Sequence, residues 1–392
     1  MRMIMKFSKS DFWDYFAVLM ILLASKSSYS LLAPLLFLVL FLASAFVYHE
    51  CKQNTFKFND SILFLVLLYC LYFFNAILYG SVRITFFAFS LGSFLIISNI
   101  SLKSFREKYF NIAFSLSVLS LITYVAMTTH LISPVSVDIN QDAPLWHYYG
   151  FNFVSPSNWS YMHRNSGIYH EPGSFQMVLN FALLFALTAE NQLRQISHYR
   201  LKFLVILAAI FFTKSTNAYI GTTLILIYVF REKILEKKIL LIPLFLVLLG
   251  MIYYVVTSDV IVGKFSAYNT ASGSAYIRVN DNIACLKMFL DHPFIGVGVG
   301  DFFQSLSNKY GNTTSSNGIL AELARLGIFW GILYFMFFIK GVKKLCKGNR
   351  LFIIFFSIVS VILFSNEDMM GYPIAYFMIF PFKNCDGKKD YV

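Results

Sequence analysis

Long apolar runs separated by short polar segments fill the chain from end to end. Allowing a few residues of error at each end, the runs that could cross a membrane as helices are 12–24, 31–48, 62–79, 84–100, 110–128, 175–188, 201–212, 218–230, 239–256, 319–339, 351–364 and 372–382. Some of them, notably the first, the seventh and the last, fall short of the roughly 20 residues that a helix needs to cross hydrocarbon. The pattern predicts an all-α integral membrane protein of about twelve transmembrane helices.

The composition supports a single membrane domain. Of the 392 residues, 58% are hydrophobic and 13% are charged, whereas soluble domains are about one quarter charged. The apolar runs leave no stretch long enough for a separate soluble core, so we expect one polytopic domain over residues 1–392, with two longer polar loops at 129–170 and 258–316. The five cysteines form no C-x-x-C pair and have no metal-ligand spacing with histidine, which indicates structural or incidental roles.

The distribution of positive charge predicts the orientation of the chain. The net charge is +12, but the Lys and Arg residues are spread over short loops without a long basic tract, so no nucleic-acid partner is expected. If the N-terminus is cytoplasmic, every predicted cytoplasmic segment is basic, and these segments together hold most of the 32 Lys and Arg residues. Both termini are therefore expected in the cytoplasm, and the two long loops on the opposite side of the membrane.

The densest group of reactive side chains lies at the end of the first long loop, in His-Arg-Asn-Ser-Gly-Ile-Tyr-His-Glu-Pro-Gly-Ser-Phe at 163–175. Polar groups beside hydrocarbon-length segments are costly to bury, so they are expected at a water-filled cavity or at the membrane surface. Arg164 could bind a phosphate or pyrophosphate while Glu171 or His170 handles a proton. The alternatives are a lipid-headgroup contact for Arg164 and a helix-start carboxylate for Glu171. His163 and His170 lack an H-E-x-x-H pattern, so a metal site is not expected.

The second long loop contains a predicted helix at 275–290. One of its faces is apolar at helical spacing, as in a helix that lies on a membrane, and consists of Val279, Ile283, Leu286 and Leu290. The other face is formed by Arg278, Asp281, Asn282 and Cys285.

Three alternating glycines follow this helix. Gly296, Gly298 and Gly300 predict a tight turn with close backbone approach, because Asp301 stands where the dinucleotide motif G-x-G-x-x-G needs its last glycine. In the tenth predicted span, Glu322 and Arg325 share one helical face, and such an ion pair can be structural or functional.

Three of these stretches, in this order, resemble bacterial O-antigen polymerases of the Wzy type and the related O-antigen ligases. They are Arg-Asn-Ser-Gly-Ile-Tyr-His-Glu-Pro-Gly-Ser-Phe, then Arg278 with His-Pro-Phe-Ile-Gly-Val-Gly-Val-Gly-Asp-Phe, and then Ser-Asn-Gly-Ile-Leu-Ala-Glu-Leu-Ala-Arg-Leu-Gly-Ile-Phe-Trp-Gly. The resemblance covers residues 164–331 by motif and the rest of the chain only by the number of spans.

The resemblance implies a GT-C-like or O-antigen ligase-like fold and a metal-independent glycosyltransferase without a cofactor. Such an enzyme joins oligosaccharide repeat units, held on undecaprenyl pyrophosphate, at the periplasmic face of the bacterial inner membrane during lipopolysaccharide biosynthesis. The implied partners are an undecaprenyl-pyrophosphate-linked oligosaccharide donor and acceptor, the lipid bilayer and a chain-length regulator protein, with no nucleic acid.

Residue roles follow from the matched positions and from one departure. Arg164 and Arg278 match the family's loop arginines, which are expected to hold the pyrophosphate leaving group. The ligases carry a His just before the Asn where this chain has Ser316, so the resemblance favours a polymerase. We expect Glu171 to be the general base, with a pKa raised by partial desolvation and with His170 as the second candidate. The expected substrate-binding residues are His163, Asp281, Asn317 and Gly298.

Two other classes of protein remain as alternatives. A lipid-linked oligosaccharide transporter is expected to place its polar groups near the midplane of broken helices, whereas here they gather in two loops on one side. A non-enzymatic scaffold needs no arginine and carboxylate at all.

Overall fold

The computed structural model describes residues 9–52, 60–80, 82–138, 144–154, 164–188, 198–236, 274–311, 315–365, 367–380 and 382–383. Its helices are α1 (Lys9–Ala24), α2 (Ser28–Leu32), α3 (Pro34–Lys52), α4 (Asp60–Tyr79), α5 (Ile84–Ile97), α6 (Leu102–Thr128), α7 (Pro172–Thr188), α9 (Tyr199–Phe212), α10 (Thr216–Glu236), α13 (Ser274–Asp291), α14 (Phe302–Tyr310), α15 (Gly318–Leu345), α16 (Arg350–Phe364) and the 3-10 turn η4 (Pro373–Ala375). Three strands, β1 (Val135–Asp138), β2 (Pro144–Tyr148) and β3 (Phe151–Val154), form one small sheet.

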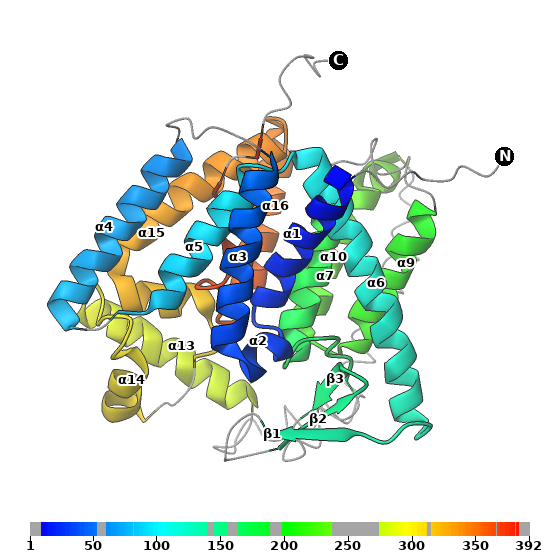
Figure 1. Cartoon of the computed structure of the whole chain (residues 1–392), viewed down its shortest axis with the longest axis horizontal. Helices are drawn as coiled ribbons and strands as arrows, with labels where there is room; N and C mark the ends of the chain where they lie inside the picture. Colours follow the sequence, from blue (N-terminus) through cyan, green and yellow to red (C-terminus); the bar gives the residue numbers. More distant parts are fainter. Residues whose placement is uncertain are drawn as a thin grey trace.

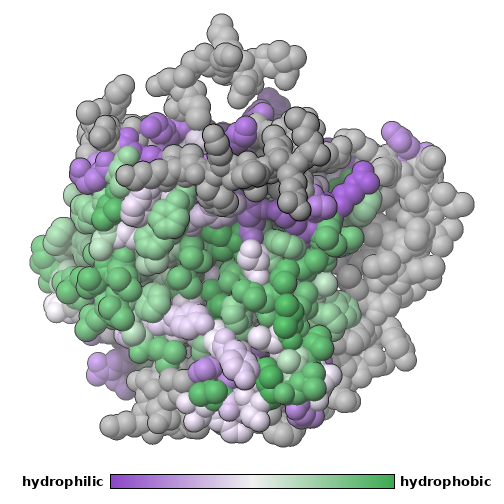
Figure 2. All heavy atoms as spheres, turned by 45° about the vertical axis from the view of Figure 1, so that its right-hand side comes forward, coloured by the Kyte–Doolittle hydropathy of each residue, from purple (hydrophilic) through white to green (hydrophobic). Residues whose placement is uncertain are grey.

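Most of the predicted spans are helices. Apart from the ninth, at 239–256, which lies outside the described residues, and the twelfth, each coincides with one of the helices above. Four are long and apolar enough to cross a membrane: Pro34–Lys52, Ile62–Tyr79, Leu102–Thr128 and Gly318–Leu345. Shorter apolar helices are Ile84–Ile97, Pro172–Thr188 and Arg350–Phe364. Figure 2 shows the resulting hydrophobic belt between hydrophilic rims, which is typical of a multi-pass membrane protein.

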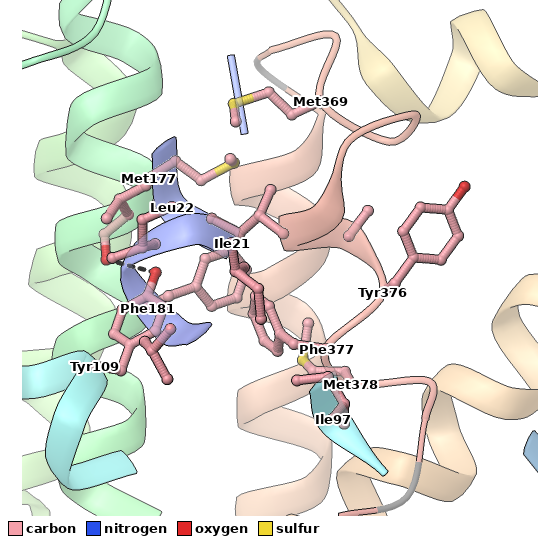
Figure 3. Close-up of a cluster of buried hydrophobic side chains, with 14 of the residues drawn as sticks. Ile21, Leu22, Ile97, Tyr109, Met177, Phe181, Met369, Tyr376, Phe377 and Met378 are labelled. Carbon is pink, nitrogen blue, oxygen red and sulfur yellow. Dashed lines mark hydrogen bonds between the residues drawn. The ribbon is translucent and has the colours of Figure 1, made fainter. Parts of the chain in front are cut away.

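The prediction of a twelfth helix is wrong. Residues 367–380 form turns around η4 instead, and nearly all of them from Met369 to Phe380 are buried. Figure 3 shows this segment packed among side chains of α1, α5, α6 and α7. Its free backbone groups find partners in the protein, since Ile374 N donates to Ser25 Oγ at 2.9 Å and Tyr334 Oη donates to the Ala375 carbonyl at 2.9 Å. Irregular backbone is tolerated at membrane depth only when it is enclosed by protein in this way.

The two ends of the described chain meet at one end of the helix bundle. Lys108 on α6 pairs with Asp11 on α1 at 3.0 Å, and Lys383 N donates to the Ile100 carbonyl at 3.0 Å. The sheet, α13 and α14 lie at the opposite end (Figure 1). The described parts of the two long loops are therefore on the same side of the bundle, as expected from the charge pattern.

The first long loop contains the small antiparallel sheet, so the prediction of an all-α protein is wrong in this detail. Strand β2 pairs with β1, with Trp146 opposite Ser136, and also with β3. Tyr149 and Gly150, between β2 and β3, both have positive φ, at 52° and 80°, as a tight hairpin turn requires. In the second long loop, α13 confirms the helix predicted at 275–290.

The glycine-rich turn after α13 docks into a break in helix α15. Gly327 leaves the helical conformation, with φ 76° and ψ −172°, which frees backbone groups that water cannot reach. The turn supplies their partners, because Ile328 N donates to the Pro293 carbonyl at 2.7 Å, Val297 N to Ala324 at 2.9 Å and Gly298 N to Arg325 at 3.1 Å. The predicted tight turn with close backbone approach is thus confirmed.

We predict that a cysteine on α14 is accessible from outside intact spheroplasts. Native Cys285 cannot serve as the reporter because it is buried, whereas Lys309 is exposed. A membrane-impermeant maleimide should label Lys309→Cys in a cysteine-free background, and in a second variant that keeps Cys51 as its single cysteine, at the other end of the bundle, it should label Cys51 only after permeabilisation. Labelling of Cys51 in intact spheroplasts would invert the orientation.

Candidate functional site

Glu171 stands directly before helix α7. Its carbonyl accepts Ser174 N at 3.1 Å and Phe175 N at 3.3 Å, so the residue begins the helix as the helix-start interpretation expected. The preceding backbone is fixed by neighbouring elements, since Asn165 N donates to the Phe212 carbonyl at 2.8 Å and Tyr169 Oη to Leu22 at 3.1 Å. The Glu171 carboxyl is therefore held by a rigid loop.

A buried carboxyl, that of Glu367, lies beside the half-buried Glu171. Glu367 follows α16 and is only 3% exposed. Lys26, between α1 and α2, places Nζ 3.8 Å from Glu367 Oε2, and Arg278 on α13 places a guanidinium nitrogen 3.7 Å from Oε1. Four segments that are distant in sequence thus bring two carboxyls and two cations together, which we call the carboxyl-pair site (Lys26, Glu171, Arg278, Glu367).

Glycines create the space that Glu367 occupies. A Cβ atom on Gly173 would overlap Glu367 Oε1, and one on Gly318, at the start of α15, would press on the Glu367 carbonyl. The Glu-Pro-Gly sequence therefore has a physical reason in this chain, because Gly173 lets α7 approach the second carboxyl.

The two carboxyls differ in protonation. Burial, and next the neighbouring charge of Glu171, raise the pKa of Glu367 from 4.5 to about 8. Burial alone would also raise the pKa of Glu171, but the charge of Lys26 and the hydrogen bond with Glu367 bring it below its ordinary value. Our expectation of a raised pKa at Glu171 is therefore wrong, and Glu367 is the carboxyl that holds the proton at neutral pH.

The contacts of Glu367 agree with a shared proton. Its buried Oε1 accepts no hydrogen bond from an N–H or O–H group in the described part of the chain. An adjacent carboxyl can satisfy this atom only when one of the two carries a proton. Two like charges side by side at a buried site are unfavourable, so the pair is most stable with one proton.

His170 is held as a neutral imidazole next to this pair. Burial lowers its pKa, the charge of Glu171 opposes the shift, and the charge of Lys26 adds to it. Its Nδ1 is buried and has no hydrogen-bond partner among the described residues. His170 can therefore orient a ligand or accept a proton, but it adds no positive charge.

The ion pair predicted in the tenth span extends to a third residue. Arg325 donates to Asp368 with both terminal nitrogens, at 3.1 and 2.6 Å, and also to Glu322. Its guanidinium lies 4.3 Å from the ring centre of Phe302. Because Asp368 is the neighbour of Glu367 in sequence, this bidentate pair fixes the loop that carries the second carboxyl.

The two arginines that were expected to hold the pyrophosphate, Arg164 and Arg278, lie against different elements. Arg278 contacts Glu367, as described above. Arg164 is 5% exposed, and its Nε donates to the Thr213 carbonyl at 2.9 Å, at the turn between α9 and α10. There its charge helps to lower the pKa of Lys214, after the larger effect of burial.

The other predicted site residues have varied positions. His163 lies outside the described residues. Asp281 is buried on α13, one helical turn from Arg278. Asn317 caps α15 by accepting Leu320 N at 3.0 Å, and Gly298 lies against the ring of Tyr79. Those contacts give Asn317 and Gly298 structural roles, and their predicted substrate contacts stay predictions.

Sequence reasoning missed Lys26, Glu367 and Asp368. A signal was present, since the polar triplet Asn366-Glu367-Asp368 interrupts two apolar runs on the side of the long loops. Lys26 is likewise a single charge between the first two runs. Within the described ranges, no group of three or more His, Cys, Asp or Glu side chains could hold a metal ion.

Comparison with known proteins adds one match. Residues 201–336 match a family model described as O-Antigen ligase, a range that contains α13, α14 and the break in α15. This part of the chain is therefore similar to the O-antigen polymerase and ligase superfamily, and the apolar helices support a multi-pass membrane protein. The match does not separate a polymerase from a ligase. No curated protein and no solved structure matches the chain.

We predict that Glu367 makes the protein less stable as the pH rises. Its pKa in the folded protein, about 8, lies above the ordinary 4.5, so its favourable contribution is full below pH 4.5 and is lost as the pH rises through 8. The lowered pKa of Glu171 affects stability only below about pH 4.5, which is outside the range of pH 6 to 9 in which Tm is to be measured. The Tm of the detergent-purified protein should fall between pH 6 and 9, and Glu367→Gln should flatten this dependence.

The matched control is Glu107→Gln, which removes a more exposed carboxyl at the other end of the bundle. It should leave the slope of Tm against pH unchanged. Equal slopes in the parent protein and in Glu367→Gln would refute the raised pKa.

Proposed function

We propose that this protein is an O-antigen type polysaccharide polymerase, which joins oligosaccharide repeat units carried on undecaprenyl pyrophosphate. The observation that carries the proposal is the carboxyl-pair site, on the side of the bundle that holds both long loops. It combines an ionised carboxylate, which can accept the proton of an acceptor hydroxyl, with two cations, which can offset the negative charge of a pyrophosphate leaving group. The location that follows is the bacterial inner membrane, with cytoplasmic termini and a periplasmic site.

In the proposed reaction, the ionised Glu171 accepts the proton of an acceptor hydroxyl. The hydroxyl oxygen forms a bond to the anomeric carbon of the donor sugar while the bond from that carbon to the pyrophosphate oxygen breaks. The pyrophosphate leaves with the electron pair of that bond. Arg278, 44% exposed at the site, offers a guanidinium to the developing negative charge.

The arrangement of charges favours Glu171 over Glu367 as the base. Only an ionised carboxylate can accept a proton, and Lys26 keeps Glu171 ionised while Glu367 retains its own proton. After the transfer both carboxyls are protonated, and no like-charge repulsion remains between them. A pair that begins with one proton therefore has room for one more.

A specific departure favours a polymerase over a ligase. The histidine that precedes the Asn in the ligases is replaced by Ser316, which has no titratable group near neutral pH. A ligase that transfers polymer to lipid A-core is the alternative function. A transporter is less well supported, because the break in α15 is filled by the turn at 293–298 rather than by a polar cavity.

The proposed partners are the lipid-linked donor and acceptor, the bilayer and a chain-length regulator protein. No metal or cofactor enters the proposed reaction. Arg164, which is more buried than Arg278 and lies at the turn between α9 and α10, is proposed as a second contact for lipid-linked pyrophosphate.

A deletion strain tests the class of function. If the protein is a polymerase, lipopolysaccharide from the strain should consist of core capped by a single repeat unit, which gel electrophoresis and mass spectrometry resolve. If the protein is a ligase, polymer should instead accumulate on the lipid carrier. Unchanged lipopolysaccharide with unchanged capsular and secreted glycans would refute both functions.

We predict that Glu171→Gln abolishes polymer or leaves very short chains. The substitution preserves shape and the helix start but cannot accept a proton, and general base catalysis is typically worth about a hundredfold to ten-thousandfold. Polymer length and amount should be measured on gels at equal membrane protein level. His170→Gln is the comparison and should be milder.

The opposite order of effects would assign the base to His170. Full-length polymer in both variants would leave the motif a structural one and would move the search for a base to Asp281.

A further inference from the structure

A pocket of about 360 Å³ lies between the C-terminal part of α13 and helix α14. It is lined by Met288, His292, Val297, Ser305, Asn308 and Lys309. Both helices are at the end of the bundle that carries the sheet (Figure 1), so the pocket opens on the same side as the carboxyl-pair site. The reaction proposed above uses none of the residues that line this pocket.

The walls of the pocket suit a neutral ligand with many hydroxyls. Met288 and Val297 provide apolar surface, while the side chains of His292, Ser305 and Asn308 form no hydrogen bond with any other described residue. Both imidazole and amide groups can donate as well as accept. A sugar ring has an apolar face and a rim of hydroxyls, and it matches this combination.

An anionic ligand is less well matched. The cation at the rim, Lys309, is already paired with Asp291, which also accepts a hydrogen bond from Tyr310 Oη at 2.8 Å. The local charge is therefore balanced, and a phosphate would meet the Asp291 carboxylate.

The pocket is built on rigid backbone. Its Val297 is fixed by the hydrogen bond to the Ala324 carbonyl at the break in α15, and Phe302 at the start of α14 packs under the Arg325 guanidinium. A preformed site loses little conformational freedom when a ligand binds, which favours weak neutral contacts such as those to sugars.

The pocket is distant from the reacting groups but on the same helix as one of them. His292 directly follows the last residue of α13 and is fourteen residues from Arg278, which corresponds to about 21 Å at 1.5 Å per residue. That separation exceeds one sugar ring, so a ligand that spans both places must be an oligosaccharide.

We propose that the pocket between α13 and α14 is an oligosaccharide subsite, which holds an interior sugar of the repeat unit while the terminal sugar reacts at Glu171. The inference rests on the proposed function, because it takes the substrate to be a lipid-linked glycan. Its effect is to select repeat units by a sugar remote from the new bond and to align the glycan along α13.

Paired variants of α14 test the subsite. Ser305→Ala/Asn308→Ala removes two polar groups from the pocket, and Gln304→Ala/Ser307→Ala removes two exposed polar groups of the same helix that do not line it. All proteins are full-length and detergent-purified, with Tm measured to establish folding. The probe is the free repeat-unit oligosaccharide, released by mild acid from lipid carrier of the deletion strain, and its binding is followed by saturation-transfer NMR.

Kinetics of polymerisation with the intact lipid-linked repeat unit complete the test. The pocket variant should lose the NMR signal and raise KM about tenfold, with kcat changed less than twofold, because two neutral hydrogen bonds are lost in binding and not in the chemical step. The control variant should match the parent. Equal binding and equal KM in both variants would overturn the subsite and leave the proposed function intact.

Failure of the proposed function has a different signature. If the folded parent protein forms no polymer from the lipid-linked unit and the Glu171→Gln strain retains normal polymer, the function is wrong. Loss of kcat rather than a rise in KM in the pocket variant would also reject the subsite, since it would place these residues in the chemical step.

Discussion

Two carboxyls side by side, one buried and one half-buried, are the constraint on which the rest of this structure depends. An ionised carboxylate taken out of water is costly unless it is paired, and two adjacent ones cannot both be ionised. The fold meets this cost with Lys26 and Arg278, from distant parts of the sequence, and with a proton on Glu367. Removal of either cation leaves the carboxyls with a single cation, so the helices that supply both must stay in place.

The irregular segment after α16 is what brings Glu367 to Glu171. The apolar run at 372–382 predicts a regular helix after Glu367. Instead the chain turns through 367–380 inside the bundle, enclosed by α1, α5, α6 and α7. The aromatic ring of Phe377 packs at 5.1 Å from both Phe181 and Phe185, which anchors the segment to α7, the helix that Glu171 begins.

Sequence reasoning predicted most of the helices and singled out two of the four residues of the carboxyl-pair site, Glu171 and Arg278. Apolar runs reveal membrane helices because side chains that face lipid are predominantly apolar, and the dense motif at 163–175 contains Glu171, which the structure places beside Glu367. The pairing of Glu171 with Lys26 and Glu367 could not be predicted, because the sequence shows polar residues in two short connections but not that the fold brings these connections together. The twelfth span failed for a related reason, since a run enclosed by protein is as apolar as one that faces lipid, and composition cannot tell the two apart.

Helix α15 connects the chemistry to the remote pocket. Its break at Gly327 exposes backbone carbonyls to the turn that forms the pocket wall, while Arg325, two residues earlier, holds Asp368 and with it the loop of Glu367. The same guanidinium packs on Phe302 of α14. Arg325 therefore contacts both the loop that carries Glu367 and helix α14, which carries Ser305 and Asn308. An apolar side chain would pack at lower cost at this buried position, so the charge of Arg325 is explained by its pairing with the Asp368 and Glu322 carboxylates, which fixes the loop of Glu367.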